Sequence, residues 1–283
     1  MATEAVDEFT TTGLKGWHHH VPGSSKPRIV IVHGLSEHSG RHLGTIHQLT
    51  AADYECVRFD LRGHGESGGK RQWIESFEDY IDDVQTIFDW IDNHLPAKPV
   101  FLHGHSLGGA ICLRFTARYQ AKLSGLMVNA PAYKIGDGIP AFKIALAKIM
   151  NRFLPGLTMK RNLDITAISR DPEVVSGCQN DPLVYAFNTV RQGYEILNAL
   201  PAMIEHVQHI TIPILFTHGQ QDRLVSLHGS QELFNSCASR DKEFICFEEA
   251  YHEVHNDFDC EAYFQSIIKW LEARCDPLIA HKQ

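Results

Sequence analysis

The sequence predicts an α/β fold in which a mostly parallel central sheet carries helices on both faces. Three observations support this prediction. Short apolar runs alternate with segments of helical periodicity along most of the chain. A Gly-x-Ser-x-Gly pentapeptide stands between one such run and one such helix. The alternation stops between Pro131 and about Ile210, which indicates a helical insertion between two strands.

Six short apolar runs are predicted strands, because each is rich in Val, Ile, Leu or Phe and ends at glycine, proline or polar residues. They cover residues 28–32, 56–60, 99–103, 123–129, 212–217 and 243–247. A further strand is expected at 14–21, and we expect its histidines at 18–20 to lie on the surface. Helices are expected at 41–52, at 75–93, from 109 onward, and from about 257 to 274.

This pattern divides the chain into a core and an insertion. The core comprises residues 1–131 and 210–283, and residues 132–209 form a helical cap, or lid. In an open parallel sheet, ligands bind outside the carboxyl ends of the strands. The site is therefore expected where the strands end, beneath the cap.

Ser106 lies at the centre of the pentapeptide Gly104-His105-Ser106-Leu107-Gly108. A serine at a sharp turn from strand to helix is a nucleophile elbow. The flanking glycines fit such a turn, because its strained backbone leaves no space for bulky neighbours. The helix that follows directs free N–H groups toward negative charge that develops beside the serine. Ser106 is the predicted catalytic nucleophile.

A serine hydroxyl needs a base, and the base needs an orienting acid. In this arrangement the order along the chain is Ser, then Asp or Glu, then His, each following a later strand. Asp222 follows the strand at 212–217, and His252 follows the strand at 243–247. His255 is the alternative base, three residues further along the same loop. We favour His252 with Asp222 as its acid.

The oxyanion of an acyl-transfer intermediate needs two N–H donors. The backbone N–H groups of Leu107, directly after the nucleophile, and of Leu35, in the loop after the strand at 28–32, are the expected donors. No cofactor or metal site is predicted, since ligand spacings such as H-E-x-x-H are missing. Five further histidines need no chemical role, and most of them are expected to be hydrogen-bonded loop residues that fix turns: His33, His38, His64, His103 and His105.

Composition narrows the function classes. The chain has 283 residues and a formal net charge of −8 with no long basic run, which argues against nucleic-acid binding. Seven scattered cysteines without a C-x-x-C argue against a disulfide framework and against zinc. No apolar run is long enough to span a bilayer, and the first residues are acidic rather than signal-like. We expect a cytoplasmic protein of undetermined oligomeric state.

The segment from Phe142 to Leu157 has an apolar stripe at helical spacing, with Lys143, Lys148 and Arg152 on other faces. A basic amphipathic helix can lie in the boundary of an anionic membrane. The same stripe could instead pack on the core and roof an acyl pocket, as half-buried helices do. Both interpretations, peripheral membrane contact and internal packing, stay open at this point.

Several motifs together resemble the monoacylglycerol lipases of the α/β-hydrolase superfamily, over roughly residues 17–271. The matching stretches are HGLSEHSGR at 33–41, DLRGHGES at 60–67, GHSLGG at 104–109, NDPL at 180–183, HGQQDR at 218–223 and AYHE at 250–253. The resemblance implies an α/β-hydrolase fold and a serine esterase that cleaves one acyl ester of a monoacylglycerol under a helical lid. The chain departs from the family in two places. It lacks the cysteine that animal members carry shortly after the residue matching Asp222, and Cys178 stands near the place where many members have a tyrosine.

Other functions remain open. A lysophospholipase or a general small-ester esterase would use the same triad, and an aminopeptidase would need cap acids such as Glu173, Asp181 or Glu195 to hold an amine. A non-catalytic ligand-binding protein on this fold is the alternative from another class, because fold alone never secures function. The favoured reading is a carboxylester hydrolase acting on a lipid or small-ester substrate.

Overall fold

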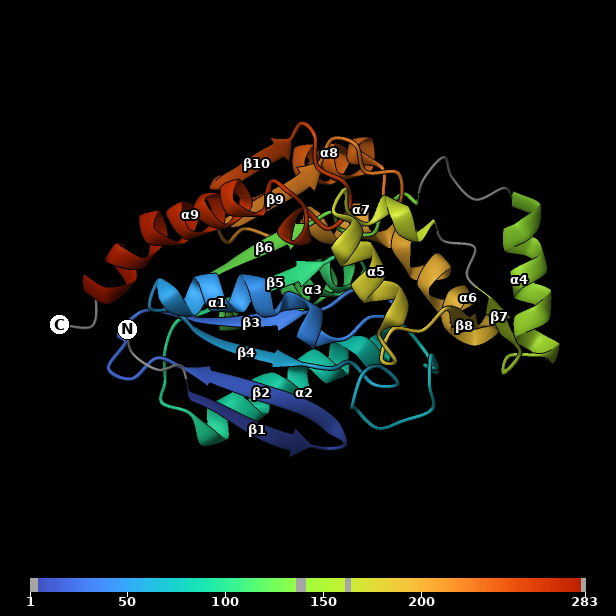
Figure 1. The fold of residues 1–283 in the computed structure, drawn as a ribbon, viewed down its shortest axis with the longest axis horizontal. Coiled ribbons are helices and arrows are strands. Elements are labelled where there is room, and N and C mark those ends of the chain that lie inside the picture. Colours follow the sequence, from blue (N-terminus) through green and yellow to red (C-terminus); the bar gives the residue numbers. More distant parts are fainter. Residues whose placement is uncertain (1–4, 136–140, 161–163, 281–283) are drawn as a thin grey trace.

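The structure, a computed structural model, describes residues 5–135, 141–160 and 164–280, without the side chains of 141–144 and 276–280 (Figure 1). An eight-stranded sheet runs through the molecule in the order β1-β2-β4-β3-β5-β6-β9-β10. From β4 to β10 all neighbouring strands are parallel, whereas β1 and β2 pair antiparallel at one edge. The strands are β1 (Ala5–Thr11), β2 (Leu14–His20), β3 (Arg28–Val32), β4 (Glu55–Phe59), β5 (Val100–His105), β6 (Gly125–Asn129), β9 (Ile214–Gly219) and β10 (Lys242–Phe247).

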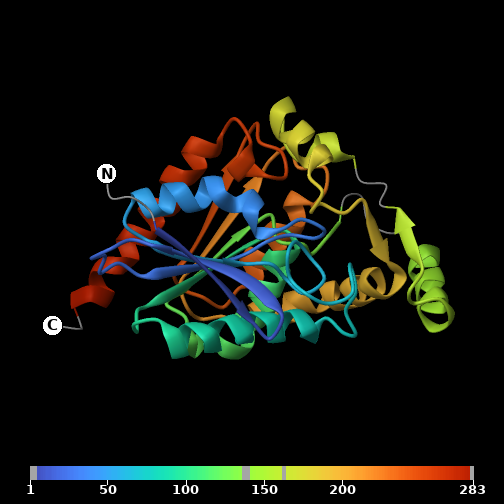
Figure 2. The ribbon, with the colours of Figure 1, turned by 60° about the horizontal axis from the view of Figure 1, so that its bottom comes forward.

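Helices cover both faces of this sheet. α1 (Leu43–Ala51) and α9 (Cys260–Ala280) lie on one face, and α2 (Glu78–His94), α3 (Leu107–Tyr119) and α8 (Leu227–Ser236) lie on the other (Figures 1 and 2). Alternation along the strands gives each layer its own core. In β3, Ile29 and Ile31 pack under α1 and α9, while Val30 and Val32 pack under α2 and α3. The predicted α/β-hydrolase architecture is confirmed.

The elements between β6 and β9 break this alternation. They include the helices α4 (Ala141–Phe153), α5 (Pro172–Asn180), α6 (Val190–Ala199) and α7 (Met203–Val207). Two short strands, β7 (Thr158–Lys160) and β8 (Phe187–Thr189), pair antiparallel in a small separate sheet. The sequence analysis predicted only helices in this region. Figure 1 shows α4 at the far end of the molecule from α9. Single 3₁₀ turns occur at Ser39–His42, Gln120–Lys122, Ile165–Ala167, Leu200–Ala202 and Val254–Asn256.

Two expectations for the first strands were wrong. The strand β1 was not foreseen, because most of its side chains are exposed and it carries no apolar run. His18 and His19 were expected on the surface, yet both are buried. The strand β2 lies inside the sheet between β1 and β4, and His19 accepts a hydrogen bond from Arg58 Nε at 3.1 Å. Tertiary partners on β4 therefore decide the burial of these histidines.

No helix within the described part of the chain is long and apolar enough to cross a bilayer.

Candidate active site

Ser106 occupies the turn between β5 and α3 with a strained backbone, φ +53° and ψ −117°. A non-glycine residue in such a conformation costs about 1–3 kcal/mol and marks functional sites. The turn closes tightly. A Cβ on Gly108 would lie 2.2 Å from the carbonyl oxygen of Val32, and a Cβ on Gly104 would lie 2.4 Å from that of Gly108. Only glycine fits these two positions, which explains the spacing of the pentapeptide.

Asp222 and His252 meet at the ends of β9 and β10. Asp222 Oδ2 lies 2.7 Å from His252 Nδ1, and the Asp222 side chain is fully buried. Its Oδ1 accepts the backbone N–H groups of Leu224 at 2.7 Å and Val225 at 3.0 Å. His218 Nε2 lies 3.1 Å from Oδ2. The acid is therefore held by four contacts that leave it little freedom to rotate.

Electrostatics keep this pair polarised. Burial alone would raise the pKa of Asp222, but His252 and His218 beside it hold that pKa well below its usual range. Burial alone would lower the pKa of His252, yet the Asp222 carboxylate raises it above its ordinary value. The carboxylate thus stays ionised and stabilises a positive imidazolium on His252.

His255, the alternative base, lies in a different environment. Its Nδ1 is 3.4 Å from Asn129 Nδ2, and its ring stacks on His42 with centroids 4.7 Å apart. Burial among other histidines holds the pKa of His255 well below its ordinary value. The contacts of His255 reach Asn129, His42, His105 and Tyr263, whereas His252 reaches Asp222.

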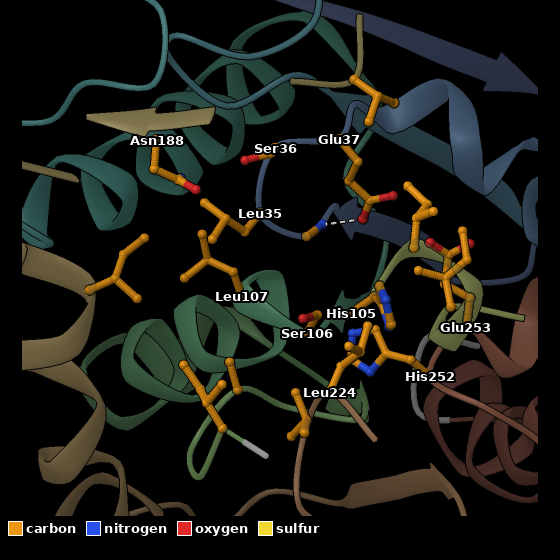
Figure 3. Close-up of a pocket in the computed structure, with 18 of the residues that line it drawn as sticks. Leu35, Ser36, Glu37, His105, Ser106, Leu107, Asn188, Leu224, His252 and Glu253 are labelled. Carbon is orange, nitrogen blue, oxygen red and sulfur yellow. Dashed lines mark hydrogen bonds between the residues drawn. The ribbon is translucent and has the colours of Figure 1, made fainter. Parts of the chain in front are cut away.

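The loop after β3 approaches Ser106 closely. A Cβ on Gly34 would lie 3.3 Å from Ser106 Cβ, so the backbone of this loop runs directly past Ser106. The Gly34 N–H donates to the Glu37 carboxylate, which closes the loop on itself (Figure 3). Leu35 from this loop and Leu107 from the start of α3 lie on the same side of Ser106 in Figure 3. Both predicted oxyanion donors therefore belong to segments beside Ser106.

These residues open onto a cavity of about 400 Å³. Ser106, Leu35, Leu107 and His252 line it, and Asp222 lies behind His252. Most of the wall is aliphatic and comes from both the core and the segment 132–209. The aliphatic lining residues are Ala132, Ile135, Ile165, Ile168, Val184, Ile196, Leu197, Leu224 and Val225.

A charged group that the sequence analysis did not assign forms the polar part of this cavity. Arg41 Nη2 lies 2.5 Å from Glu253 Oε2, and Arg41 Nε lies 3.3 Å from Glu37 Oε2. Burial alone would lower the pKa of Arg41, but Glu253 and Glu37 raise it. Burial alone would raise the pKa of Glu37, but His42 beside it lowers that pKa. Glu37 and Arg41 were visible in the motif at 33–41, but nothing in the motif linked them to Glu253, 212 residues away from Arg41.

The other histidines follow the expectation in part. His33, His38 and His64 each hydrogen-bond a backbone group in a loop. His103 and His105 lie in β5 rather than in turns, and His103, in the strand predicted at 99–103, contacts the Tyr263 hydroxyl at 2.7 Å. Among the described residues, no group of three or more His, Cys, Asp or Glu side chains could hold a metal ion.

Comparisons with known proteins agree with this geometry. The family model described as "Serine aminopeptidase, S33" matches residues 23–259. The monoacylglycerol lipase of Mycolicibacterium smegmatis is 33% identical over 86% of this chain and 87% of its own. Human monoglyceride lipase is 31% identical over 89% and 84%, respectively. Phospholipase YtpA of Bacillus subtilis is 30% identical over 84% and 92%.

Among solved structures, the monoacylglycerol lipase of Paleococcus ferrophilus superposes with a TM-score of 0.82 at 30% identity. The match covers 96% of this chain and 99% of that one. The chain therefore belongs to the serine aminopeptidase S33 family of α/β-hydrolases and, within it, to the monoacylglycerol lipase family. It is a serine hydrolase of lipid esters.

Proposed function

We propose that the protein hydrolyses monoacylglycerols to fatty acid and glycerol with Ser106, His252 and Asp222 as its catalytic triad. One observation carries the proposal: Ser106 and His252 line a single, mostly aliphatic cavity, and His252 is bonded to a buried carboxylate. Fluorophosphonate labelling tests the nucleophile. Labelling should occur at Ser106 and should vanish, together with turnover, in Ser106→Ala.

The proposed reaction has two halves. Ser106 Oγ attacks the ester carbonyl carbon as its proton passes to His252 Nε2, and a tetrahedral oxyanion forms. Collapse breaks the bond to the glycerol oxygen, which takes the proton from His252 and leaves. Water then attacks the acyl-enzyme with His252 again as base, and the fatty acid departs from Ser106.

The oxyanion in each half is proposed to accept the backbone N–H groups of Leu35 and Leu107. Support comes from their position, since Leu107 opens α3 directly after Ser106 and Gly34 packs against Ser106 Cβ. Removing one such donor typically costs about 10²–10³-fold in kcat.

We propose that residues 132–209 form the cap over a core made of residues 1–131 and 210–283. The aliphatic wall of the cavity would then hold the acyl chain between cap and core. The cavity volume of about 400 Å³ is within the usual range for a small ligand. A second or third acyl chain would need space that this cavity does not offer, so triacylglycerols are expected to react poorly.

Glycerol is the proposed occupant of the polar part of the cavity. Glu37 Oε2 and Arg41 Nε are buried there and face each other as an ion pair at 3.3 Å. With Glu253 they give this part of the cavity wall groups that a polyol could hydrogen-bond. The two carboxylates, Glu37 and Glu253, and the one guanidinium, Arg41, sum to a formal charge of −1. A neutral glycerol fits this charge better than a phosphodiester does.

The second candidate is a lysophospholipase, favoured by the relative named phospholipase in Bacillus subtilis. Turnover of monoacylglycerol and lysophosphatidylcholine at equal chain length separates the two. Faster hydrolysis of the lysophospholipid would replace the first proposal, and turnover of acetate and butyrate esters alone would indicate a general esterase. A chain that labels no serine and turns over no ester would be a non-catalytic binding protein.

The family model's description raises the aminopeptidase again. The cap acids considered for an amine substrate, Glu173, Asp181 and Glu195, do not line the cavity, and Asp181 instead pairs with His38 at 2.8 Å. The carboxylates that do line it pair with Arg41. The ester substrate is therefore the better proposal.

We also propose that the helix α4 rests on a membrane surface. Its stripe is exposed, with Ile149 at 58% and Phe153 at 70%, while Lys148 and Arg152 supply positive charge to the same helix. The side chain of Phe142, at the start of the expected stripe, lies outside the described residues. Further exposed apolar residues on and after α4 are Leu146, Leu154, Leu157 and Met159. Such a surface suits an enzyme whose substrate resides in lipid.

A further inference from the structure

A buried polar network joins the loop of Leu35 to the segment 132–209. At its centre is Gln72, which has no exposed surface. Gln72 Oε1 accepts hydrogen bonds from Ser36 Oγ at 2.7 Å and from Asn188 Nδ2 at 3.2 Å. Its backbone carbonyl accepts one from Thr189 Oγ1 at 2.5 Å. A single core residue thus contacts both the residue after Leu35 and the strand β8.

This arrangement is strained in three ways. Gln72 has φ +54° and Ser36 has φ +62°, a left-handed conformation that is unfavourable for both residue types. Gln72 Nε2 is buried and has no hydrogen-bond partner among the described residues. Strained residues and unpaired buried groups persist where the surroundings enforce them, and they concentrate at functional sites.

The network fixes Ser36 from two directions. Its hydroxyl is held by Gln72, and its carbonyl accepts the N–H of Tyr185 at 2.9 Å. On the other side of Leu35, Gly34 is held by the Glu37 carboxylate. Leu35 is therefore clamped between two anchored neighbours, and the anchor at Ser36 depends on contacts from 132–209. Figure 3 shows Ser36, Asn188 and Leu35 together on one side of Ser106.

We propose that Gln72 is a positioning residue that orients the Leu35 N–H toward the oxyanion and couples this orientation to the docking of the segment 132–209. The inference rests on the proposed esterase function, in which Leu35 is an oxyanion donor. Gln72 itself touches no reacting atom. It acts through Ser36, whose left-handed turn directly follows Leu35.

The same network supplies a matched control. Asn188 Nδ2 donates to Gln192 Oε1 at 2.6 Å, and Gln192 Nε2 is 3.0 Å from the Tyr80 hydroxyl. Tyr80→Phe removes a buried hydrogen bond of the network without touching Ser36. It should lower thermal stability and leave kcat unchanged.

The experiment compares Gln72→Leu, Ser36→Ala, their double variant and Tyr80→Phe in the full chain. Steady-state kinetics on a soluble monoacyl ester give kcat and KM, and an alkyl boronic acid reports affinity for a tetrahedral adduct. We expect kcat of Gln72→Leu to fall about 10- to 100-fold with KM within about threefold, because small misplacements in an active site cost up to about 10²-fold. Boronate affinity should fall by a similar factor, and the double variant should be no worse than the poorer single one.

Several outcomes would overturn the inference. One is a folded Gln72→Leu with kcat within about twofold of the starting enzyme; another is an equal loss of kcat in Tyr80→Phe. If Gln72→Leu does not fold, Ser36→Ala decides the matter on the same criteria. An unaltered chain that is active and labelled at Ser106, with a normal Gln72→Leu, rejects only the role of Gln72. An unaltered chain that is neither labelled nor active rejects the proposed function, and this inference with it.

Discussion

Asparagine at position 222 would change the chemistry of the site while keeping its shape. Asp222 Oδ1 accepts two backbone N–H groups, at 2.7 Å and 3.0 Å, so the carbonyl oxygen of an asparagine would stay there. Its NH₂ group would then face His252 Nδ1 across the 2.7 Å contact. A donor at this place pairs with an unprotonated Nδ1, so the proton of a neutral His252 moves to Nε2. In that tautomer His252 cannot accept the proton of Ser106.

From the same loss of tautomer in other triads we expect kcat to fall about 10⁴-fold, or about 5 kcal/mol of transition-state stabilisation. KM should change little, because Asp222 does not line the cavity. Stopped assays with a monoacylglycerol and the rate of fluorophosphonate labelling both measure the effect. Asp60→Asn is the control. Asp60 is equally buried and accepts two backbone N–H groups, each at 2.8 Å, but these belong to Ser39 and Glu66 and not to the triad. A folded Asp222→Asn with kcat within tenfold of the unaltered enzyme would refute the assignment.

Three further predictions follow from the same geometry. His252→Ala should lose nearly all activity while His255→Ala keeps a measurable fraction; the reverse pattern in turnover assays would make His255 the base. Because Asp222 raises the pKa of His252 and only the neutral imidazole accepts a proton, kcat/KM should fall about tenfold per pH unit below that pKa, with the midpoint above that of an ordinary histidine. A flat profile from pH 8 to pH 5, measured with a soluble ester, would argue against a histidine base. Replacing Ile149 and Phe153 by serine should weaken sedimentation with anionic vesicles and leave turnover of a soluble ester unchanged, and unaltered vesicle binding would count against membrane docking by α4.

Local sequence patterns could predict the buried parallel strands because such strands are continuous apolar runs. The strands β3, β6 and β9 follow this rule, whereas the run in β4 is interrupted by Arg58. The strand β1 carries no such run, because most of its side chains are exposed, and it joins the sheet through backbone pairing with β2 and ion pairs such as that of Asp7 with His20. Its only large anchor is Phe9, which stacks on Trp90 of α2 with centroids 3.6 Å apart. That contact depends on a partner 81 residues away and leaves no local signal.

The residues of the candidate site also differ in whether a local sequence pattern indicates them. Ser106 could be predicted from a local motif, and Asp222 and His252 from their order after successive strands. Glu253 stands in the AYHE motif at 250–253 but was given no role, because its importance arises from contact with Arg41, 212 residues away. Cys178 was noted only as a departure from relatives, yet it lines the cavity. The role of a residue cannot be predicted from local sequence when it depends on a contact with a residue far away in the chain.

Backbone strain explains why some site residues can be predicted from the local sequence and others cannot. Ser36, Gln72, Ser106 and Ala130 all have positive φ, and none is glycine. Nothing in their side chains favours a left-handed conformation, so the surrounding contacts must impose it. For Ser106 the surrounding turn depends on the close packing of Gly104 and Gly108, which the motif shows. For Ser36 and Gln72 they are hydrogen bonds to Tyr185, Asn188 and Thr189 in the segment 132–209. If the Leu35 N–H serves the oxyanion as we propose, the contacts from residues 185–189 would help to keep this strained loop in the conformation that the chemistry needs.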